Sequence, residues 1–166
     1  FYKNFKQNVE VQATNDKMQK NILDESGNFL EKYFNNLLKQ INSKNSYLTE
    51  YTINDIPIEL DSKESIMLKG NIDRIDFYDN KIKVVDYKTS KPKSDNEIRG
   101  NTKNSNGDYY RQLIFYKLLV DNHKDWQLSE AELNFVKPNE KGEFISRNYV
   151  IANEEVDDLK KEIKDK

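Results

Sequence analysis

The residues best suited to chemistry are two aspartates and a lysine in the middle of the chain. Asp86 and Lys88 lie two positions apart in VVDYKTSK, where the pattern predicts a strand. Because side chains two apart in a strand share one face, a carboxylate and an ammonium would lie side by side. Asp73, in the preceding predicted strand, can come near Asp86 in a hairpin, although the register cannot be read from sequence. Two carboxylates with few softer ligands available suit a hard cation, Mg²⁺ or Mn²⁺.

Such a cation site favours phosphodiester hydrolysis. A cation held by Asp73 and Asp86 can polarise a phosphate oxygen and lower the pKa of a bound water. Lys88 would then orient that water or neutralise charge that develops on the phosphoryl group. The alternative is a solvated hairpin in which Asp86 and Lys88 form a surface ion pair worth about 0–1 kcal/mol. Asp-x-Lys is a short pattern with many chance matches, so taken alone it favours the surface ion pair.

Two predicted strands must bring these residues together. Residues 66–78 and 81–89 are rich in Ile, Val, Phe and Tyr, which is typical of strands. Residues 79–80, Asp-Asn, readily form a tight turn, so a hairpin is the simplest connection. Strand alternation places Asp76 on the face opposite the first aspartate, and we interpret Asp76 and Arg74 as supporting residues.

Helices and further strands flank this hairpin. The other predicted elements are helices at 16–41 and 108–122, a last helix that Asn153 can cap, an extended segment with a turn or bulge at 47–60, and strands at 131–137 and 143–150. Residues 90–107 lack a hydrophobic period and are predicted to form a long loop. This order favours a single α/β domain over residues 1–166, with a mixed β-sheet flanked by helices.

Three ordered motifs within residues 69–119 resemble the RecB-type nuclease domain of the PD-(D/E)xK nuclease superfamily. They are GNIDRID, DYKTSK and QLIFYKLL, and three motifs in order are much more specific than any one of them. The resemblance implies a restriction-endonuclease-like fold. It also implies the roles of four residues: Asp73 and Asp86 as acidic metal ligands, Tyr87 as a ligand through its backbone carbonyl, and Lys88 as the signature lysine.

The resemblance extends to two predicted helices. Gln112 and Tyr116 match a Q-x-x-x-Y element that is associated with DNA contact beside the active site, and a spacing of four puts them on one helix face. Without that context, Tyr116 would be a core residue and Gln112 its surface neighbour. On the first helix, Glu31 occupies a place where many members carry a histidine ligand. Glutamate also suits Mg²⁺, so Glu31 is a candidate ligand, with a solvent-facing charge as the alternative.

A basic segment follows the second strand. Residues 81–111 contain eight basic and four acidic residues, although the net charge of the whole chain is -2. Lys91, Lys93 and Arg111 can grip a DNA backbone at the rim of the site, because phosphate contacts give affinity without reading sequence. A solvated charged loop explains these residues equally well.

The composition excludes several other kinds of site. The 166 residues contain no cysteine and one histidine, which excludes iron–sulfur clusters, zinc–thiolate sites and cysteine nucleophiles. No apolar run approaches the roughly 20 residues that span a bilayer, and no signal peptide is evident. We therefore expect no membrane partner and a cytoplasmic location.

These expectations combine into one function and one alternative. The resemblance implies a Mg²⁺-dependent deoxyribonuclease, acting as an exonuclease in recombination or repair, with a helicase module in the same chain or complex. The abrupt start at FYKNFKQ is what we expect of a domain excised from a larger helicase–nuclease protein. The alternative is a catalytically silent nuclease-fold domain that binds DNA or serves as a scaffold. Asp73, Asp86 and Lys88 together count against it, because a silent copy has no chemical need for converging carboxylates.

Overall fold

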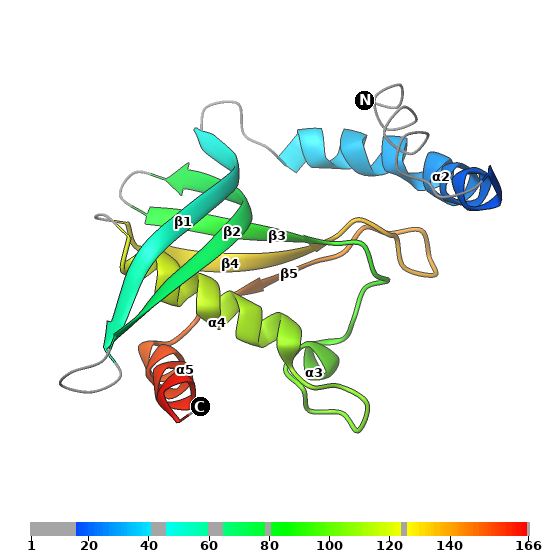
Figure 1. The fold of residues 1–166 in the computed structure, drawn as a ribbon. Coiled ribbons are helices and arrows are strands. Elements are labelled where there is room, and N and C mark those ends of the chain that lie inside the picture. Colours follow the sequence, from blue (N-terminus) through cyan, green and yellow to red (C-terminus); the bar gives the residue numbers. More distant parts are fainter. Residues whose placement is uncertain (1–15, 41–45, 60–64, 79–80, 124–125, 166) are drawn as a thin grey trace.

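The computed structural model describes residues 16–40, 46–59, 65–78, 81–123 and 126–165, and a mixed sheet of five strands forms its centre (Figure 1). In spatial order the strands are β1 (Tyr47–Glu59), β2 (Ser65–Tyr78), β3 (Lys81–Lys88), β4 (Leu128–Phe135) and β5 (Ser146–Tyr149). Neighbouring strands are antiparallel except β3 and β4, which are parallel. The carboxyl ends of β3 and β4 therefore meet at one edge of the sheet. The predicted mixed sheet is confirmed.

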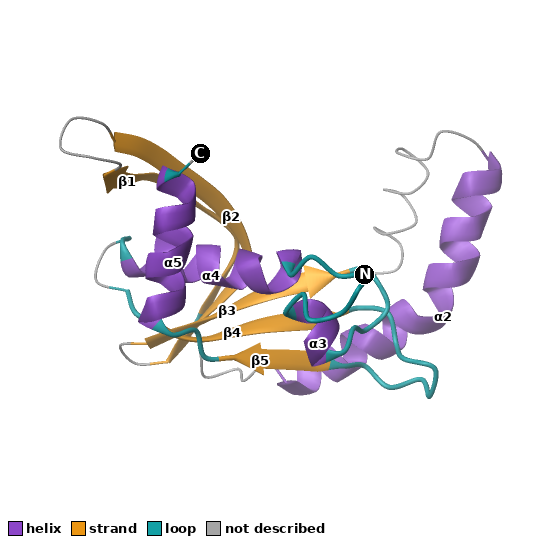
Figure 2. Cartoon of the chain, turned by 90° about the horizontal axis from the view of Figure 1, so that it is seen from below, coloured by secondary structure: helices purple, strands orange, loops and turns teal. Residues whose placement is uncertain are grey.

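Helices cover both faces of this sheet. Among the described residues they are α2 (Asp16–Gln40), α3 (Asp95–Ile98), α4 (Asp108–Asp121) and α5 (Asn153–Lys164). α4 packs against β2 and β4, and α5 packs against α4. α2 lies on the opposite face of the sheet (Figure 2). There the Tyr33 hydroxyl contacts Asn134 of β4. None of the helices in the described ranges is long and apolar enough to cross a membrane.

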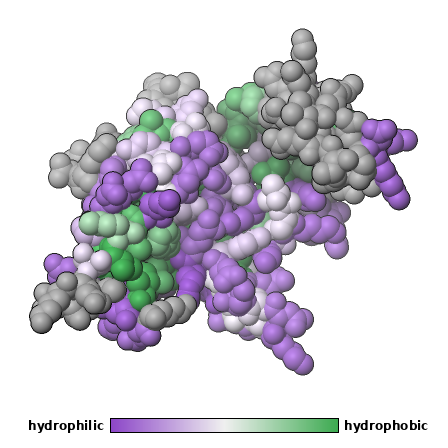
Figure 3. Space-filling view, in the orientation of Figure 1, coloured by the Kyte–Doolittle hydropathy of each residue, from purple (hydrophilic) through white to green (hydrophobic). Residues whose placement is uncertain are grey.

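The core lies between α4 and the sheet. Its fully buried side chains come from β1, β2, β3, β4, α3 and α4, and they include Ile53, Ile72, Ile75, Val84, Ile98, Leu113, Leu118, Leu119, Leu133 and Phe135. Each such side chain contributes about 1.5–3 kcal/mol by leaving water. Most charged side chains lie on the surface, with Arg74 and Asp86 among the buried exceptions. Figure 3 shows hydrophilic side chains over much of the middle of one face.

Gly70 lets β2 pass close under α4. A Cβ at this position would lie 2.5 Å from Leu119 Cδ1 and 3.3 Å from Phe115 Cε1, inside a packed core. The glycine of the GNIDRID motif is therefore a packing residue. It sets the distance between α4 and the strand that carries Asp73.

The predicted hairpin is confirmed. β2 and β3 pair antiparallel from Tyr78 opposite Lys81 to Arg74 opposite Val85. Its turn, residues 79–80, lies outside the described residues. β1 is likewise the predicted extended segment with a bulge, and its register against β2 shifts between Ile53 and Ile56.

The prediction of an irregular loop over residues 90–107 is wrong at α3. Ser94 caps this single turn, since its Oγ accepts from Glu97 N at 3.3 Å while a Glu97 carboxylate oxygen accepts from Ser94 N at 2.8 Å. Ile98 at its end is fully buried. The Ser-x-x-Glu signal of a capping box was present in the sequence, but one turn is too short to show a hydrophobic period.

The carboxyl-terminal elements begin and end at other residues than predicted. β4 starts at Leu128 rather than at residue 131, and β5 spans only Ser146–Tyr149 of the predicted 143–150. Asn153 is the first residue of α5 and not its cap. Ala152 takes the cap position, and its N–H donates to Glu155 Oε2 at 2.9 Å.

Candidate active site

β3 directs Asp86 and Lys88 toward α4, as strand alternation predicts. Asp86 is only 3% exposed, and its Oδ2 lies 2.7 Å from Lys88 Nζ. Taking a carboxylate out of water costs several kcal/mol unless a counter-charge is close, so Lys88 is what allows Asp86 to be buried here. The pair is therefore not the solvated surface ion pair of the alternative interpretation.

Asp86, Lys88, Gln112 and Tyr116 form a closed ring of polar contacts. Lys88 Nζ donates to Gln112 Oε1 at 2.6 Å, and Gln112 Nε2 donates to the Tyr116 hydroxyl at 2.8 Å. The Tyr116 hydroxyl donates to Asp86 Oδ1 at 2.9 Å, and the Asp86–Lys88 ion pair closes the ring. α4 supplies two of the four groups, so it fixes the positions of the carboxylate and the ammonium on β3.

Asp73 joins this group where β2 and β3 separate. The β2–β3 ladder ends at Arg74 and Val85, which leaves Tyr87 N without a backbone partner on β2. Asp73 Oδ2 accepts from that N–H at 2.8 Å. Burial raises the pKa of Asp73, the Tyr87 N–H lowers it, and the nearby Asp86 carboxylate raises it further. The Asp86 carboxylate is thus close enough for its charge to act on Asp73.

The donor set suits a hard cation that keeps part of its hydration shell. Asp86 Oδ2 is buried and accepts no hydrogen bond of good geometry among the described residues. The described residues contain no group of three or more His, Asp or Glu side chains arranged around a cation site. Mg²⁺ is commonly held by one or two carboxylates, with waters and substrate phosphates completing its coordination. Asp73, Asp86 and the Tyr87 carbonyl fit that pattern.

Tyr116 supports the site from within the core. It is 4% exposed, and burial together with Asp86 raises its pKa, so the hydroxyl stays protonated and remains a donor. Gln112 is half-buried. The spacing of four does bring both side chains to the carboxylate and the lysine, but Tyr116 is too buried to reach a nucleic acid directly.

Tyr109 lies beside the site and was not among the residues predicted for it from the sequence. Lys88 Nζ lies 4.5 Å and Lys93 Nζ 4.2 Å from the centre of its ring. Its hydroxyl lies 3.1 Å from Ser90 Oγ. Its place in the sequence could have identified it, because residue 109 lies on the same helix face as Gln112 and Tyr116. Tyr109 brings two ammonium groups to one aromatic ring.

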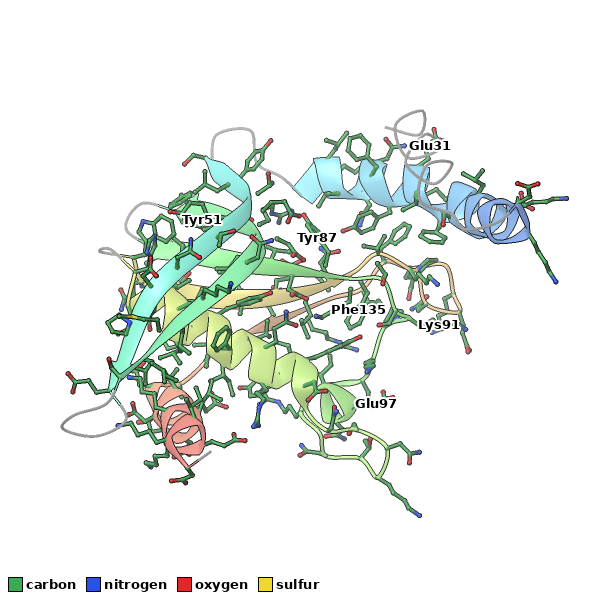
Figure 4. All side chains as sticks on the ribbon, viewed as in Figure 1. Glu31, Tyr51, Tyr87, Lys91, Glu97 and Phe135 are labelled. Carbon is green, nitrogen blue, oxygen red and sulfur yellow. The ribbon has the colours of Figure 1, made fainter. Side chains whose placement is uncertain are left out.

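Of the predicted rim residues, Lys91 and Lys93 lie on the segment that directly follows Lys88. Lys91 is exposed near the β4–β5 turn (Figure 4). Together with Lys141 it lines a hollow of about 360 Å³ between its own segment and that turn. Arg111 lies elsewhere. Its guanidinium pairs with Glu162 of α5 and lines a separate groove between α4 and α5.

The structure does not bring Glu31 to Asp73 and Asp86. Glu31 is exposed on α2, which approaches the sheet from the other face (Figure 4). α2 turns Tyr33 toward the sheet, where its hydroxyl donates to Asn134 Oδ1 at 2.7 Å. Residues two apart on a helix point about 200° apart, so Glu31 and Tyr33 cannot both face the sheet.

We compared the chain with known protein families, curated proteins and solved structures. A family model described as the PD-(D/E)XK nuclease superfamily matches residues 5–166. A solved structure titled "Crystal structure of SSO0001" aligns with a TM-score of 0.48 and 17% sequence identity, over 99% of this chain and 66% of that one. The chain thus spans just under two thirds of that solved chain. No curated protein sequence matches this one.

Proposed function

We propose, given that this chain belongs to the PD-(D/E)XK nuclease superfamily, that it is a divalent-metal-dependent nuclease that hydrolyses DNA. The observation that carries the proposal is the convergence of Asp73 and Asp86 beside a paired lysine. Asp73 accepts from the backbone N–H of Tyr87, the residue next to Asp86, and Lys88 lies 2.7 Å from Asp86. Two carboxylates held close together repel each other, and a bound cation relieves that repulsion.

The proposed metal ligands are Asp73, Asp86 and the backbone carbonyl of Tyr87, with Mg²⁺ or Mn²⁺ as the ion. When bound, such an ion polarises a phosphate oxygen and lowers the pKa of a bound water. Lys88 offsets the charge of Asp86 in the metal-free chain. With DNA bound, its ammonium is placed to stabilise negative charge that develops on the phosphoryl oxygens.

Gln112, Tyr116 and Tyr109 position these groups. Gln112 accepts from Lys88 and Tyr116 donates to Asp86, so neither charged group is free to turn away during the reaction. Preorganised donors and charges of this kind avoid reorganisation at the moment of bond cleavage. Tyr109 adds a flat ring against the ammonium of Lys88.

We infer that the DNA backbone runs across the carboxyl ends of β3 and β4. Lys91 and Lys141 line the hollow at this edge, and Lys93 lies over Tyr109 beside Lys88. Lysines along such a path bind phosphates without reading bases, which suits cleavage with little sequence preference. We leave Arg111 out of this proposed path, because its guanidinium pairs with Glu162.

The finer assignment is to the RecB-type branch. GNIDRID, DYKTSK and the Q-x-x-x-Y element support it, as does the contact of Gln112 and Tyr116 with the catalytic pair. On this assignment the chain is one nuclease domain, an exonuclease in DNA recombination or repair, that works with a helicase module in the same chain or complex. A cytoplasmic location is consistent with a DNA substrate.

DNA cleavage with matched variants tests this function. Purified protein is incubated with linear and circular DNA, single- and double-stranded, in Mg²⁺ or Mn²⁺. We expect degradation of linear DNA that Asp86→Ala and Lys88→Ala abolish, while circular DNA survives. Lys81→Ala is the control, since Lys81 is an exposed lysine at the other end of β3. A folded wild-type chain that neither binds metal nor cleaves DNA would instead support the silent DNA-binding or scaffolding domain.

A further inference from the structure

We propose that Arg74 and Tyr87 form a positioning pair that holds the metal-binding segment of β3 from the opposite face of the sheet. The inference rests on the proposed function, because it concerns the same carboxylates. It assigns a role to two side chains that point away from the reaction.

Arg74 is buried and contacts two side chains, those of Tyr87 and Asp76. It is 6% exposed, and its Nη1 donates to the Tyr87 hydroxyl at 2.5 Å. Its Nε and Nη2 face the two carboxylate oxygens of Asp76 at 2.9 and 3.0 Å. The guanidinium carbon also lies 5.6 Å from the centre of the Tyr87 ring. A planar guanidinium that donates to several fixed partners has one orientation only.

Tyr87 connects this face of the sheet to the active site through its backbone. Its side chain points away from α4, while those of Asp86 and Lys88 on either side point toward α4. Figure 4 shows Tyr87 between β3 and α2. Its N–H donates to Asp73, and its carbonyl is a proposed metal ligand. Fixing the ring of Tyr87 therefore fixes the peptide groups that the metal site uses.

The pair acts at the point where the backbone ladder stops. Arg74 and Val85 are the last paired residues of β2 and β3, so beyond them no ladder sets the distance between the strands. Beyond the ladder, side-chain contacts hold the two strands together on both faces of the sheet. On one face Asp73 binds Tyr87 N at 2.8 Å, and on the other Arg74 binds the Tyr87 hydroxyl at 2.5 Å. The spacing of Asp73 and Asp86 depends on these two contacts.

Stability alone does not explain a buried arginine here. Neighbouring positions on the same two strands hold Ile75, Val84 and Val85, all fully buried. Replacing buried ion pairs by apolar residues of similar volume is often neutral or stabilising. What the arginine adds over an apolar residue is directional contact, which fits a positioning role.

Mn²⁺ binding by tyrosine variants separates positioning from packing. Tyr87→Phe removes only the hydroxyl that Arg74 contacts. Tyr33→Phe is the matched control, since the Tyr33 hydroxyl is also buried on this side of the sheet but contacts Asn134 on β4. Isothermal titration calorimetry gives Mn²⁺ affinity, thermal melting gives stability, and single-turnover cleavage gives the rate and the DNA dependence.

We expect Tyr87→Phe to weaken Mn²⁺ binding about 10- to 100-fold, as loss of an outer partner of a metal site does, and to slow cleavage with DNA affinity unchanged. Tyr33→Phe should lower the melting temperature and leave Mn²⁺ affinity intact. Arg74→Lys, which keeps the charge but cannot contact Asp76 and Tyr87 together, should weaken Mn²⁺ binding as Tyr87→Phe does. If Tyr87→Phe and Arg74→Lys both bind Mn²⁺ as tightly as the wild type, this inference is wrong, while the proposed function is unaffected. A folded wild-type chain that binds no Mn²⁺ overturns the proposed function and this inference together.

Discussion

The Tyr116 hydroxyl donates a 2.9 Å hydrogen bond to Asp86 Oδ1, so α4 is attached to β3 at the carboxylate itself. Tyr116 is buried in the core that joins α4 to the sheet. The position of Asp86 therefore depends on the packing of a helix that begins more than twenty residues later in the sequence. Core and active site share this residue, and their contributions can be separated by experiment.

Tyr116→Phe should slow cleavage and lower stability. The variant keeps the ring but removes the donor to a buried carboxylate, and a hydrogen bond to a charged group is worth about 1.5–3 kcal/mol of unfolding free energy. Tyr110→Phe is the control, because its hydroxyl contacts Glu155 at 2.7 Å, away from the carboxylates. Urea unfolding and cleavage rates are measured for both. Equal cleavage rates in the two variants would contradict a positioning role for Tyr116.

Two substitutions of Tyr109 should separate the contribution of its ring to DNA binding and cleavage from that of its hydroxyl. Tyr109→Ala removes the surface beneath two ammonium groups, a contact worth about 0.5–2 kcal/mol per cation, and should weaken DNA binding and slow cleavage. Tyr109→Phe keeps the ring and should retain most of both. Binding is measured by fluorescence anisotropy with a labelled oligonucleotide, without metal. If Tyr109→Phe is as impaired as Tyr109→Ala, the contact with Ser90 matters instead of the ring.

Asp73→Asn should abolish metal binding while making the metal-free chain at least as stable as the wild type at pH 7. The pKa of Asp73 is raised in the folded chain, so the ionised carboxylate disfavours folding, and stability is lost as pH rises through that pKa. Asparagine removes the charge and can still accept from Tyr87 N. The stability difference should vanish as the pH falls to about 3, where Asp73 is mostly protonated in both the folded and the unfolded state. Urea unfolding from pH 3 to pH 8 in the presence of a chelator measures it, and a less stable variant at pH 7 would contradict the expected sign.

Lys91→Ala should reduce the salt dependence of DNA binding. Each phosphate contact contributes about 0.9 to the slope of log affinity against log salt on duplex DNA, so losing one lysine of the path lowers the slope by about that amount. Lys81→Ala should leave the slope unchanged. Titrations at several salt concentrations give the slopes. Identical slopes for Lys91→Ala and the wild type would exclude Lys91 from the DNA path.

Gly70→Ala should destabilise the chain by about 1–3 kcal/mol, the usual cost of forcing extra volume into a packed core. The added Cβ would lie 2.5 Å from Leu119 Cδ1. Lys69→Ala, at the exposed neighbouring position, should stay within about 0.5 kcal/mol of wild type. Urea unfolding compares the two variants. A Gly70→Ala chain as stable as the control would mean that Leu119 moves aside freely.

Local pattern made part of this site predictable. Asp86 and Lys88 share a face because strand side chains alternate, and Gln112 and Tyr116 share one because helix residues four apart do. The position of Asp76 on the face opposite Asp73 also follows from alternation, and it is confirmed by the contact of Asp76 with Arg74, which also contacts the Tyr87 hydroxyl.

The remaining features of the site depend on contacts between residues that are far apart in the sequence. Arg111 was predicted at the rim with Lys91 and Lys93, but its side chain contacts Glu162, 51 positions later, and no local pattern predicts that partner. Glu31 looked like a possible ligand, but the rotation of α2 is set by Tyr33 and Asn134, 101 positions apart. Where β2 and β3 separate is a matter of register, which alternating apolar residues leave open.

The central claim is that Asp73 and Asp86 share one divalent cation, and anomalous diffraction from a crystal soaked in Mn²⁺ tests it most directly. The predicted result is one anomalous peak between the two carboxylates and next to the Tyr87 carbonyl, at metal–oxygen distances of about 2.0–2.3 Å. The same peak should be absent from Asp86→Ala crystals. Strong anomalous density elsewhere on the chain, with none between Asp73 and Asp86, would contradict the claim.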